Sequence, residues 1–288
     1  MNYGMTLPPF GALAEPAYLV ELAQAAETAG WDGFFLWDTV IHDGNFYPIA
    51  DPWIALAAVA AATTRIRLGV MLTPLTRRRP WQVARQAVTL DRLAQGRLIF
   101  GAGLGGAPDD FARFGEVTDA KTRGRMLDEA LEIVAGLWSG EPFGYQGEHY
   151  TMEPVAFRPG AAQTPRIPIW LGSNWPNRAP FRRAARYDGV FPLCGGFPPA
   201  PDEFSAIRAY VEAHRPAPGP FDYVASGLTP GDDPAAGAAQ VAPYLAAGAT
   251  WWLETVDPWS LAHRWDVKFD AAAEAWMDAC IRQPPPRV

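Results

Sequence analysis

The sequence has few of the residues on which several common kinds of site depend. It contains two cysteines, Cys194 and Cys280, which are too few and too far apart for a disulfide framework or a zinc site. Histidine occurs four times, and lysine occurs only at Lys121 and Lys268. A formal net charge of −7 argues against wrapping nucleic acid or coating an anionic membrane. Because nothing indicates disulfides, a reducing cytoplasm is the expected location.

Long hydrophobic runs are also absent. The longest clearly apolar stretch, Trp53–Ala62, is too short to span a bilayer, and the start MNYGMTLPPFG does not resemble a secretory signal. The scarcity of lysine beside abundant Ala, Gly and Pro is typical of a GC-rich bacterial genome. A hydrophobic fraction of 49% with 19% charged residues indicates a globular protein with a large core, which we expect to form one domain over residues 1–288.

What the sequence does contain is a regular alternation of short apolar runs and longer segments with helical spacing. The runs expected to form buried strands are Asn2–Thr6, Gly33–Trp37, Arg67–Thr73, Arg97–Ala102, Ile167–Leu171, Gly189–Pro192, Asp222–Ser226 and Thr250–Leu253. The segments expected to form helices are Glu15–Ala29, Asp51–Thr63, Pro80–Ala94, Ala120–Trp138, Arg178–Arg186, Pro201–Ala213, Pro234–Ala247 and Pro258–Arg282.

Eight strands that are each followed by a helix predict an α/β fold, the (β/α)₈ TIM barrel. A doubly wound open sheet is the alternative, but it predicts a glycine-rich turn after the first strand, where the chain has LPPFGALAE. In a barrel, the loops that leave the carboxyl ends of the strands form the active face. The segment Ser139–Arg166 returns at the opposite end, and we expect it to be an irregular insertion between helix 4 and strand 5.

The second strand ends in FFLWDTVIHDG, which supplies the first candidate residues of a site. Asp38 is the first polar residue after the apolar run, where barrel enzymes place catalytic or ligand-binding groups, and Thr39 follows it. The alternative for Asp38 is a turn cap. His42 could exchange protons near neutral pH, or could simply be exposed.

Two further loops are candidates for binding a cofactor. The fourth strand runs into FGAGLGGAPDDF, whose glycines would let backbone approach a flat or anionic ligand, or would form a tight corner. After the fifth strand, Gly172, Ser173 and Asn174 precede a helix near Arg178, which makes a plausible phosphate seat.

Other catalytic sets are missing from the sequence. We find no nucleophile elbow, no Cys/His pair and no cluster of histidines and carboxylates for metal-dependent hydrolysis. We therefore expect no metal and infer that a cofactor carries the chemistry. The apolar and aromatic loops Leu7–Phe10, Asp38–Tyr47 and Gly103–Phe114 suit a small, moderately apolar organic substrate. We consider a homodimer as the assembly, although no sequence feature indicates the oligomeric state.

Long blocks of the chain resemble the luciferase-like monooxygenase family. They include GWDGFFLWD, DPWIALAAVAAATTRIRLGVMLTPLTRRRPWQVARQAVTLDRLAQGRLIFGAGLG, KTRGRMLDEALEIVAGLWSGEPFGYQGEHY, PIWLGSNWPNRAPFRRAARYDGVFP and GATWWLET. The resemblance implies a (β/α)₈ barrel that binds FMN or the deazaflavin F420 at the carboxyl ends of the strands. It implies an oxidoreductase, either a monooxygenase or a dehydrogenase, that moves hydride or electrons between this cofactor and a small organic molecule.

The resemblance also implies roles for individual positions. Asp38 matches an aspartate beside the deazaflavin, and a cis peptide that supports the ring is expected at Val70–Met71. The remaining positions that match cofactor contacts are Thr73, Leu104, Gly105, Gly172, Ser173 and Trp175.

Two positions depart from the F420-dependent sugar-phosphate dehydrogenases. Thr39 stands where many members have histidine, and Gly106 stands where those dehydrogenases have glutamate. These departures argue against sugar-phosphate oxidation, and they leave a catalytically silent cofactor-binding protein as the alternative function. Of the three arginines at 77–79, we expect at most one to touch a ligand, because arginines at a helix start oppose the helix dipole.

Overall fold

The barrel predicted from the sequence is present in the computed structural model, which describes residues 1–42, 47–106, 108–264, 267 and 269–288. Parallel strands form one sheet, in the order β3-β2-β1-β11-β10-β9-β8-β5-β4. The strands are β1 (Asn2–Leu7), β2 (Gly33–Leu36), β3 (Arg67–Val70), β4 (Thr73–Pro74), β5 (Phe100–Gly103), β8 (Ile169–Trp175), β9 (Gly189–Cys194), β10 (Asp222–Gly227) and β11 (Trp251–Thr255).

The expected third strand is divided in two, which is why the sheet has nine strands. β3 pairs with β2, whereas β4 pairs with β5 through Thr73↔Ala102 and Pro74↔Gly103. A further bridge, Leu68↔Leu98, joins β3 to the segment before β5 and closes the barrel. On the other side of the barrel, β9 and β10 pair only through Gly189 and Val190, so these strands part toward their carboxyl ends.

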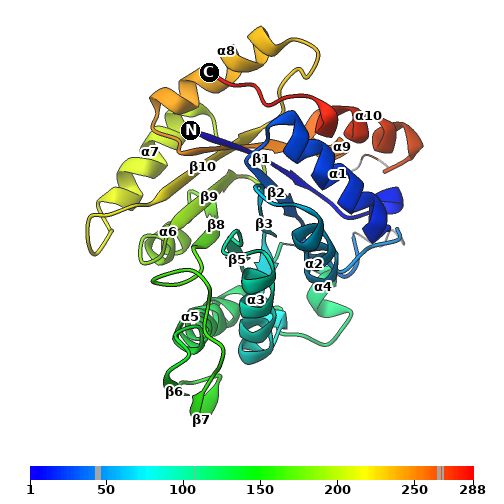
Figure 1. Cartoon of the computed structure of the whole chain (residues 1–288). Coiled ribbons are helices and arrows are strands. Elements are labelled where there is room, and N and C mark those ends of the chain that lie inside the picture. The colour runs from blue at the N-terminus through cyan, green and yellow to red at the C-terminus, as the bar shows by residue number, and fades with distance from the viewer. Residues whose placement is uncertain (43–46, 107, 265–266, 268) are drawn as a thin grey trace.

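The helices surround the sheet, as Figure 1 shows. Several begin with proline in the first turn, where a missing N–H is harmless, or after an aspartate that caps the helix, such as Asp51 before α2. The longer helices are α1 (Pro16–Ala29), α2 (Pro52–Ala62), α3 (Pro80–Leu93), α5 (Ala120–Leu137), α6 (Arg178–Ala184), α7 (Pro201–Glu212), α8 (Pro234–Ala246) and α10 (Ala271–Arg282). Short helical segments are η1 (Gly11–Ala14), η2 (Leu75–Arg77), α4 (Asp109–Ala112) and α9 (Pro258–Ala262).

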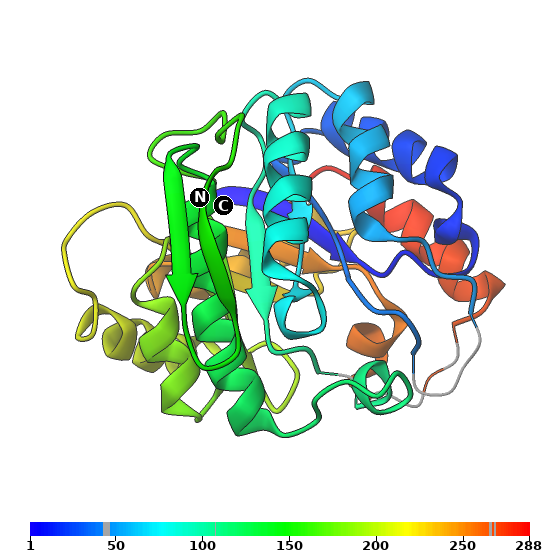
Figure 2. The ribbon, with the colours of Figure 1, turned by 90° about the horizontal axis from the view of Figure 1, so that it is seen from below.

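Two expectations about elements are wrong. The insertion between α5 and β8 is not irregular, because it contains the antiparallel hairpin of β6 (Pro142–Gln146) and β7 (Thr151–Ala156). This hairpin stands outside the barrel beside α5 (Figures 1 and 2). The segment Pro258–Arg282 is not one helix, because α9 ends at His263 in the left-handed conformation and α10 starts after the cap Asp270.

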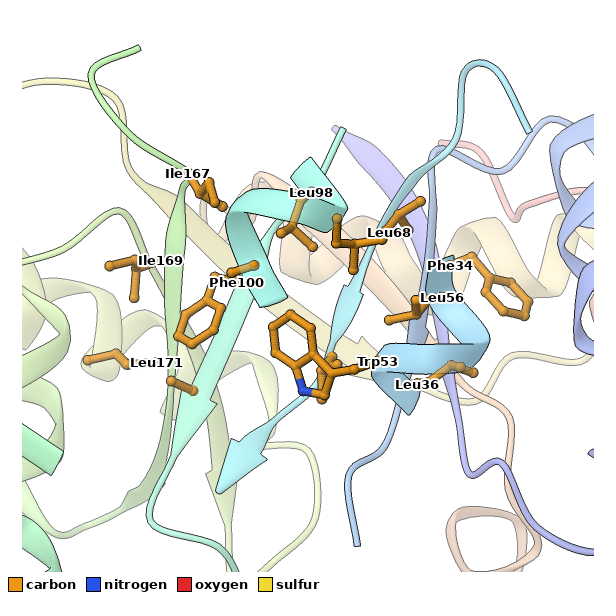
Figure 3. Packing of buried hydrophobic residues seen from close by; sticks show 14 of the residues in the cluster. Phe34, Leu36, Trp53, Leu56, Leu68, Leu98, Phe100, Ile167, Ile169 and Leu171 are labelled. Carbon is orange, nitrogen blue, oxygen red and sulfur yellow. The ribbon is translucent and has the colours of Figure 1, made fainter. Parts of the chain in front are cut away.

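The barrel wall has a core on each side. Phe35, Trp170 and Trp251 belong to a cluster inside the barrel. Phe34, Leu36, Phe100 and Leu171 belong to the cluster between the wall and the helices, where Trp53 of α2 packs against Phe100 (Figure 3). Because side chains alternate along a strand, the residue two positions after an inner core residue also points inward. It lies closer to the carboxyl ends of the strands.

Candidate active site

The floor of the active end is the layer of inward-facing residues directly above the inner core. Two of its polar side chains bond to one another, since Trp37 Nε1 donates to Thr6 Oγ1 at 3.1 Å. The Thr255 hydroxyl donates to the carbonyl oxygen of Gly227 at 2.9 Å. By strand alternation this floor consists of the last inward-facing residue of each strand: Thr6, Trp37, Leu72, Gly103, Asn174, Leu193, Ser226 and Thr255. Its side chains are mainly apolar or hydroxyl-bearing, with one amide at Asn174, and none of them is charged.

A non-prolyl cis peptide lies at the break between β3 and β4, but it joins Met71 to Leu72. The expectation of Val70–Met71 is wrong by one residue. The Met71 N–H still donates to Leu36 O at 2.8 Å, so the peptide before Met71 continues the ladder with β2. The chain leaves the ladder after Met71. Leu72 then packs against Gly103 and Gly172, where any side chain larger than hydrogen would collide with it.

Asp38 is buried in a cluster of ion pairs at the mouth of the barrel. Its carboxylate accepts from Arg77 Nη2 at 2.6 Å and from Arg78 Nε at 3.1 Å. Arg77 also reaches Asp110 of α4, with 2.8 Å between Nη1 and Oδ2. The two arginines and two aspartates pair with one another, and Arg78 also lies 3.8 Å from Asp51. Asp38 is therefore held by arginine side chains, and among the described residues it caps no turn.

Asp110 fixes the loop that follows β2. Its carboxylate accepts from the backbone N–H groups of Val40 and Ile41 at 2.9 and 3.0 Å. Thr39 Oγ1 lies 2.8 Å from the same carboxylate. The loop between β5 and α5 is thereby tied to the loop after β2, and the Thr39 side chain points into this polar cluster.

His42 is not an exposed loop residue, because only 8% of its surface is accessible. Its ring packs 4.5 Å from that of Trp259 and 5.3 Å from that of Phe10, measured between centroids. Tyr47 and Phe269 complete this aromatic cluster between β1, the loop after β2 and α9. The cluster places His42 at the active end, surrounded by aromatic rings.

The residues predicted to bind a phosphate belong to a strand and not to a loop before a helix. Gly172, Ser173, Asn174 and Trp175 lie within β8 and do not form a loop. The guanidinium of Arg178 stacks on the Trp175 ring at 3.7 Å and also faces Tyr210 at 4.6 Å. Arg178 is therefore held against aromatic rings at the first residue of α6.

Leu104 and Gly105 form a tight corner after β5. Gly105 has a φ of 83°, and a side chain there would collide with the ring of Phe111. The carbonyl oxygen of Leu104 accepts from Arg123 Nη1 at 3.1 Å and from Thr76 Oγ1 at 3.3 Å. These bonds fix the backbone at the rim next to β4.

Three buried hydroxyls near the carboxyl ends of the strands have no hydrogen-bond partner within the described part of the chain. They belong to Thr73, Ser173 and Ser226. Buried polar groups are normally satisfied, so such atoms indicate where a bound molecule could supply partners. Sequence reasoning missed Ser226, although the expected strand ended on it. Alternation along the expected strand could have identified it, because Val224 and Ser226 must face the same side. The pairing of Ser226 with the inward-facing Leu253 shows that this side is the barrel interior.

Two other acidic groups near this end are buried for structural reasons. Burial raises the pKa of Asp257 to about 6, although its carboxylate caps α9 through Ser260. Burial also raises the pKa of Glu254, whose carboxylate binds Thr229 and Trp252 on the outer side of the wall. Within the described ranges, no group of three or more His, Cys, Asp or Glu side chains is placed to hold a metal ion.

Comparison with known proteins agrees with this architecture. The profile of the luciferase-like monooxygenase family matches residues 1–282. The chain therefore belongs to the luciferase-like monooxygenase family, which confirms the class of oxidoreductase predicted from the sequence.

The most similar relatives include proteins with and without an assigned activity. An uncharacterised protein of Mycobacterium tuberculosis is 34% identical over 231 residues, covering 73% of this chain and 77% of that protein. An F420-dependent glucose-6-phosphate dehydrogenase of Nakamurella multipartita is 34% identical over 206 residues, covering 67% of this chain but only 59% of that enzyme.

A solved structure confirms the predicted fold. It is that of an F420-dependent secondary alcohol dehydrogenase in complex with an F420–acetone adduct. It superposes with a TM-score of 0.76 at 16% identity and covers 99% of this chain and 98% of that one. At this identity the likeness concerns the fold alone.

Proposed function

We propose that the protein is an F420-dependent oxidoreductase that acts on a small organic molecule, with FMN as the alternative cofactor. The observation that carries this proposal is the floor of the active end. It holds apolar side chains and hydroxyls, while the ionised groups described beside it pair with one another. Such a floor provides no acid–base or nucleophilic set, so the chemistry must come from a bound cofactor.

The residues at this end fit a flat heterocyclic ring. Gly103 and Gly172 make room for Leu72, whose apolar side chain covers the inner face of the wall and offers a surface on which a ring could lie. The Thr73 hydroxyl is completely buried and has no hydrogen-bond partner among the described residues, and it would gain one from the ring's polar edge. Such a cofactor supplies the hydride acceptor or donor, and Trp37, Leu72 and Leu193 would exclude water around it.

The proposal assigns different roles to the predicted site residues. Val70, Met71 and Thr73 shape the wall, and Leu104 and Gly105 form the rim. Gly172, Ser173, Asn174 and Trp175 on β8, with Arg178, border the cofactor's tail. Asp38 and Thr39 act by positioning, because Arg77 and Asp110 hold them. A homodimeric assembly and a cytoplasmic bacterial location, consistent with two free cysteines, are further parts of the proposal.

Titration of the purified protein with F420 and with FMN, followed by fluorescence, tests this proposal. We expect micromolar binding of F420 and weaker binding of FMN. Thr73→Val should raise the dissociation constant roughly three- to tenfold, because a neutral hydrogen bond contributes about 1 kcal/mol. Thr89→Val is the matched control, since Thr89 lies on the exposed face of α3.

Different outcomes contradict different parts. Tight FMN binding without F420 binding would replace the cofactor, and binding of neither would refute the function. A catalytically silent binding protein is the second candidate, because Asp38 is ion-paired and His42 lies among aromatic rings. It would be supported if the bound reduced cofactor were reoxidised no faster, with any substrate or oxygen, than the free cofactor.

A further inference from the structure

Ser226 is a floor residue whose buried hydroxyl has no role in the fold that the described contacts explain. Its side chain follows Val224 on the inward face of β10, and only 1% of its surface is accessible. Its hydroxyl has no hydrogen-bond partner in the described ranges of the chain. The neighbouring hydroxyls of Thr6 and Thr255 are bonded to Trp37 and Gly227, so Ser226 is the floor hydroxyl left for a ligand.

The wall beside Ser226 is the part of the barrel that is not closed by strand pairing. The last pair between β9 and β10 is Val190↔Tyr223, and Ser226 lies three residues further along. Across this gap the facing inward residue is Leu193, which is only half-buried. A ligand can therefore reach the hydroxyl by displacing one apolar side chain, without breaking a ladder bond.

The charges near the floor restrict what such a ligand can be. Asp38, Asp110, Arg77 and Arg78 are paired with one another, Arg78 also lies 3.8 Å from Asp51, and Arg178 is stacked on Trp175. The described floor side chains therefore offer no counter-ion, and an anion or cation would lose its hydration without compensation. A neutral molecule with one oxygen would match a mainly apolar floor on which, among the described residues, Ser226 carries the hydroxyl without a partner.

We propose that Ser226 is the specificity-determining residue that hydrogen-bonds the oxygen of an uncharged alcohol or carbonyl substrate. The inference deepens the proposed function, on which it rests, by naming the substrate class. The Ser226 hydroxyl donates to a carbonyl oxygen or accepts from an alcohol hydroxyl. The floor side chains that the structure describes offer no counter-ion, so we expect charged substrates, including sugar phosphates, to bind poorly beside Ser226.

The test uses three probes of similar shape: cyclohexanone, methylenecyclohexane without the oxygen, and cyclohexanecarboxylate with a charge. Their dissociation constants are measured by ligand-observed NMR on the whole protein, with and without F420 or FMN. We expect cyclohexanone to bind at least tenfold more tightly than the carboxylate. Ser226→Ala should weaken cyclohexanone binding roughly three- to tenfold and leave methylenecyclohexane binding unchanged.

The controls separate a binding role from a structural one. Ser205→Ala removes a hydroxyl from the exposed face of α7 and should change nothing. Ser226→Cys keeps the side-chain volume with a weak hydrogen-bonding group, so it should reproduce the loss even if the alanine variant folds poorly.

The possible results distinguish this inference from the proposed function. Equal binding of the carboxylate, no binding of any probe, or no response of cyclohexanone to Ser226→Ala would overturn the inference. A loss of cofactor affinity in Ser226→Ala without a change for cyclohexanone would also overturn it. Failure of both cofactors to bind while cyclohexanone still responds to Ser226→Ala would refute only the proposed function.

Discussion

At the scale of single residues, Arg77 is the buried charge on which the active end depends. Its guanidinium contacts both Asp38 and Asp110, and 5% of its side chain is exposed. Replacing it by methionine keeps the volume but leaves two buried carboxylates without their shared cation. Removing one partner of a buried pair costs about 3–5 kcal/mol. We expect Arg77→Met to lower the free energy of unfolding by that amount in urea titrations.

A nearby surface pair provides the control for this prediction. Arg113, the residue directly after α4, pairs with Asp109 at the start of that helix, but its side chain is 54% exposed. Exposed pairs of this kind contribute about 0–1 kcal/mol, so Arg113→Met should be nearly neutral. Equal effects of the two substitutions would show that the Arg77 cluster does not hold the loops at this end.

The cluster also shows what residue types alone could not predict. The predicted barrel places Asp38, after the second strand, and the three consecutive arginines, after the third strand, at the same end. In the structure two of these arginines, Arg77 and Arg78, pair with Asp38. The distance between Asp38 and these arginines, and their burial, depend on how the loops pack in three dimensions. The spacing of the residues along the sequence does not predict either.

At the scale of elements, two glycines set the approach of β3 to the chain around β5. A side chain on Gly69 would collide with the carbonyl oxygen of Ile99, and one on Gly101 with that of Val70. These obstacles are backbone atoms, which cannot move aside like a flexible side chain. We expect Gly69→Ala to lower the free energy of unfolding by about 1–3 kcal/mol, measured by thermal and urea unfolding.

Gly106 offers a matched glycine-to-alanine control. A side chain there meets nothing within 4 Å, and the residue lies outside the strands. Gly106→Ala should change stability by no more than about 0.5 kcal/mol. A comparable loss in both variants would mean that chain entropy, and not the close approach of the two strands, explains the glycine at position 69.

The elements themselves were largely predictable, because buried strands and amphipathic helices have different periods. All eight expected strand positions hold strands, with β3 and β4 sharing one of them. The failures have local causes. The position of the break after Met71 depends on the last backbone N–H that still bonds to β2, which the sequence does not specify. The hairpin β6–β7 has mostly exposed residues, so it gives no apolar run. The face of Ser226 required the register of β10 against β11.

At the scale of the whole molecule, the two ends of the barrel have separate tasks. The carboxyl ends of the strands hold the floor and the charge cluster. The opposite end is covered by the C-terminal tail, which lies beside the N-terminus in both views (Figures 1 and 2). There Arg287 donates to Gly30 O, Val288 N donates to the Tyr3 hydroxyl at 3.0 Å, and Pro285 and Pro286 are buried.

Removal of residues 284–288 should therefore separate stability from binding. The loss of buried proline surface and of the bonds to the first strand should lower the free energy of unfolding by about 1–3 kcal/mol. The dissociation constant for the cofactor, measured by fluorescence on the folded protein, should stay within about twofold, because the floor lies at the far end of the strands. Arg287→Ala, which keeps the prolines, should lose only part of the stability. If the truncated protein were equally stable but bound cofactor weakly, the division of tasks between the two ends would be wrong.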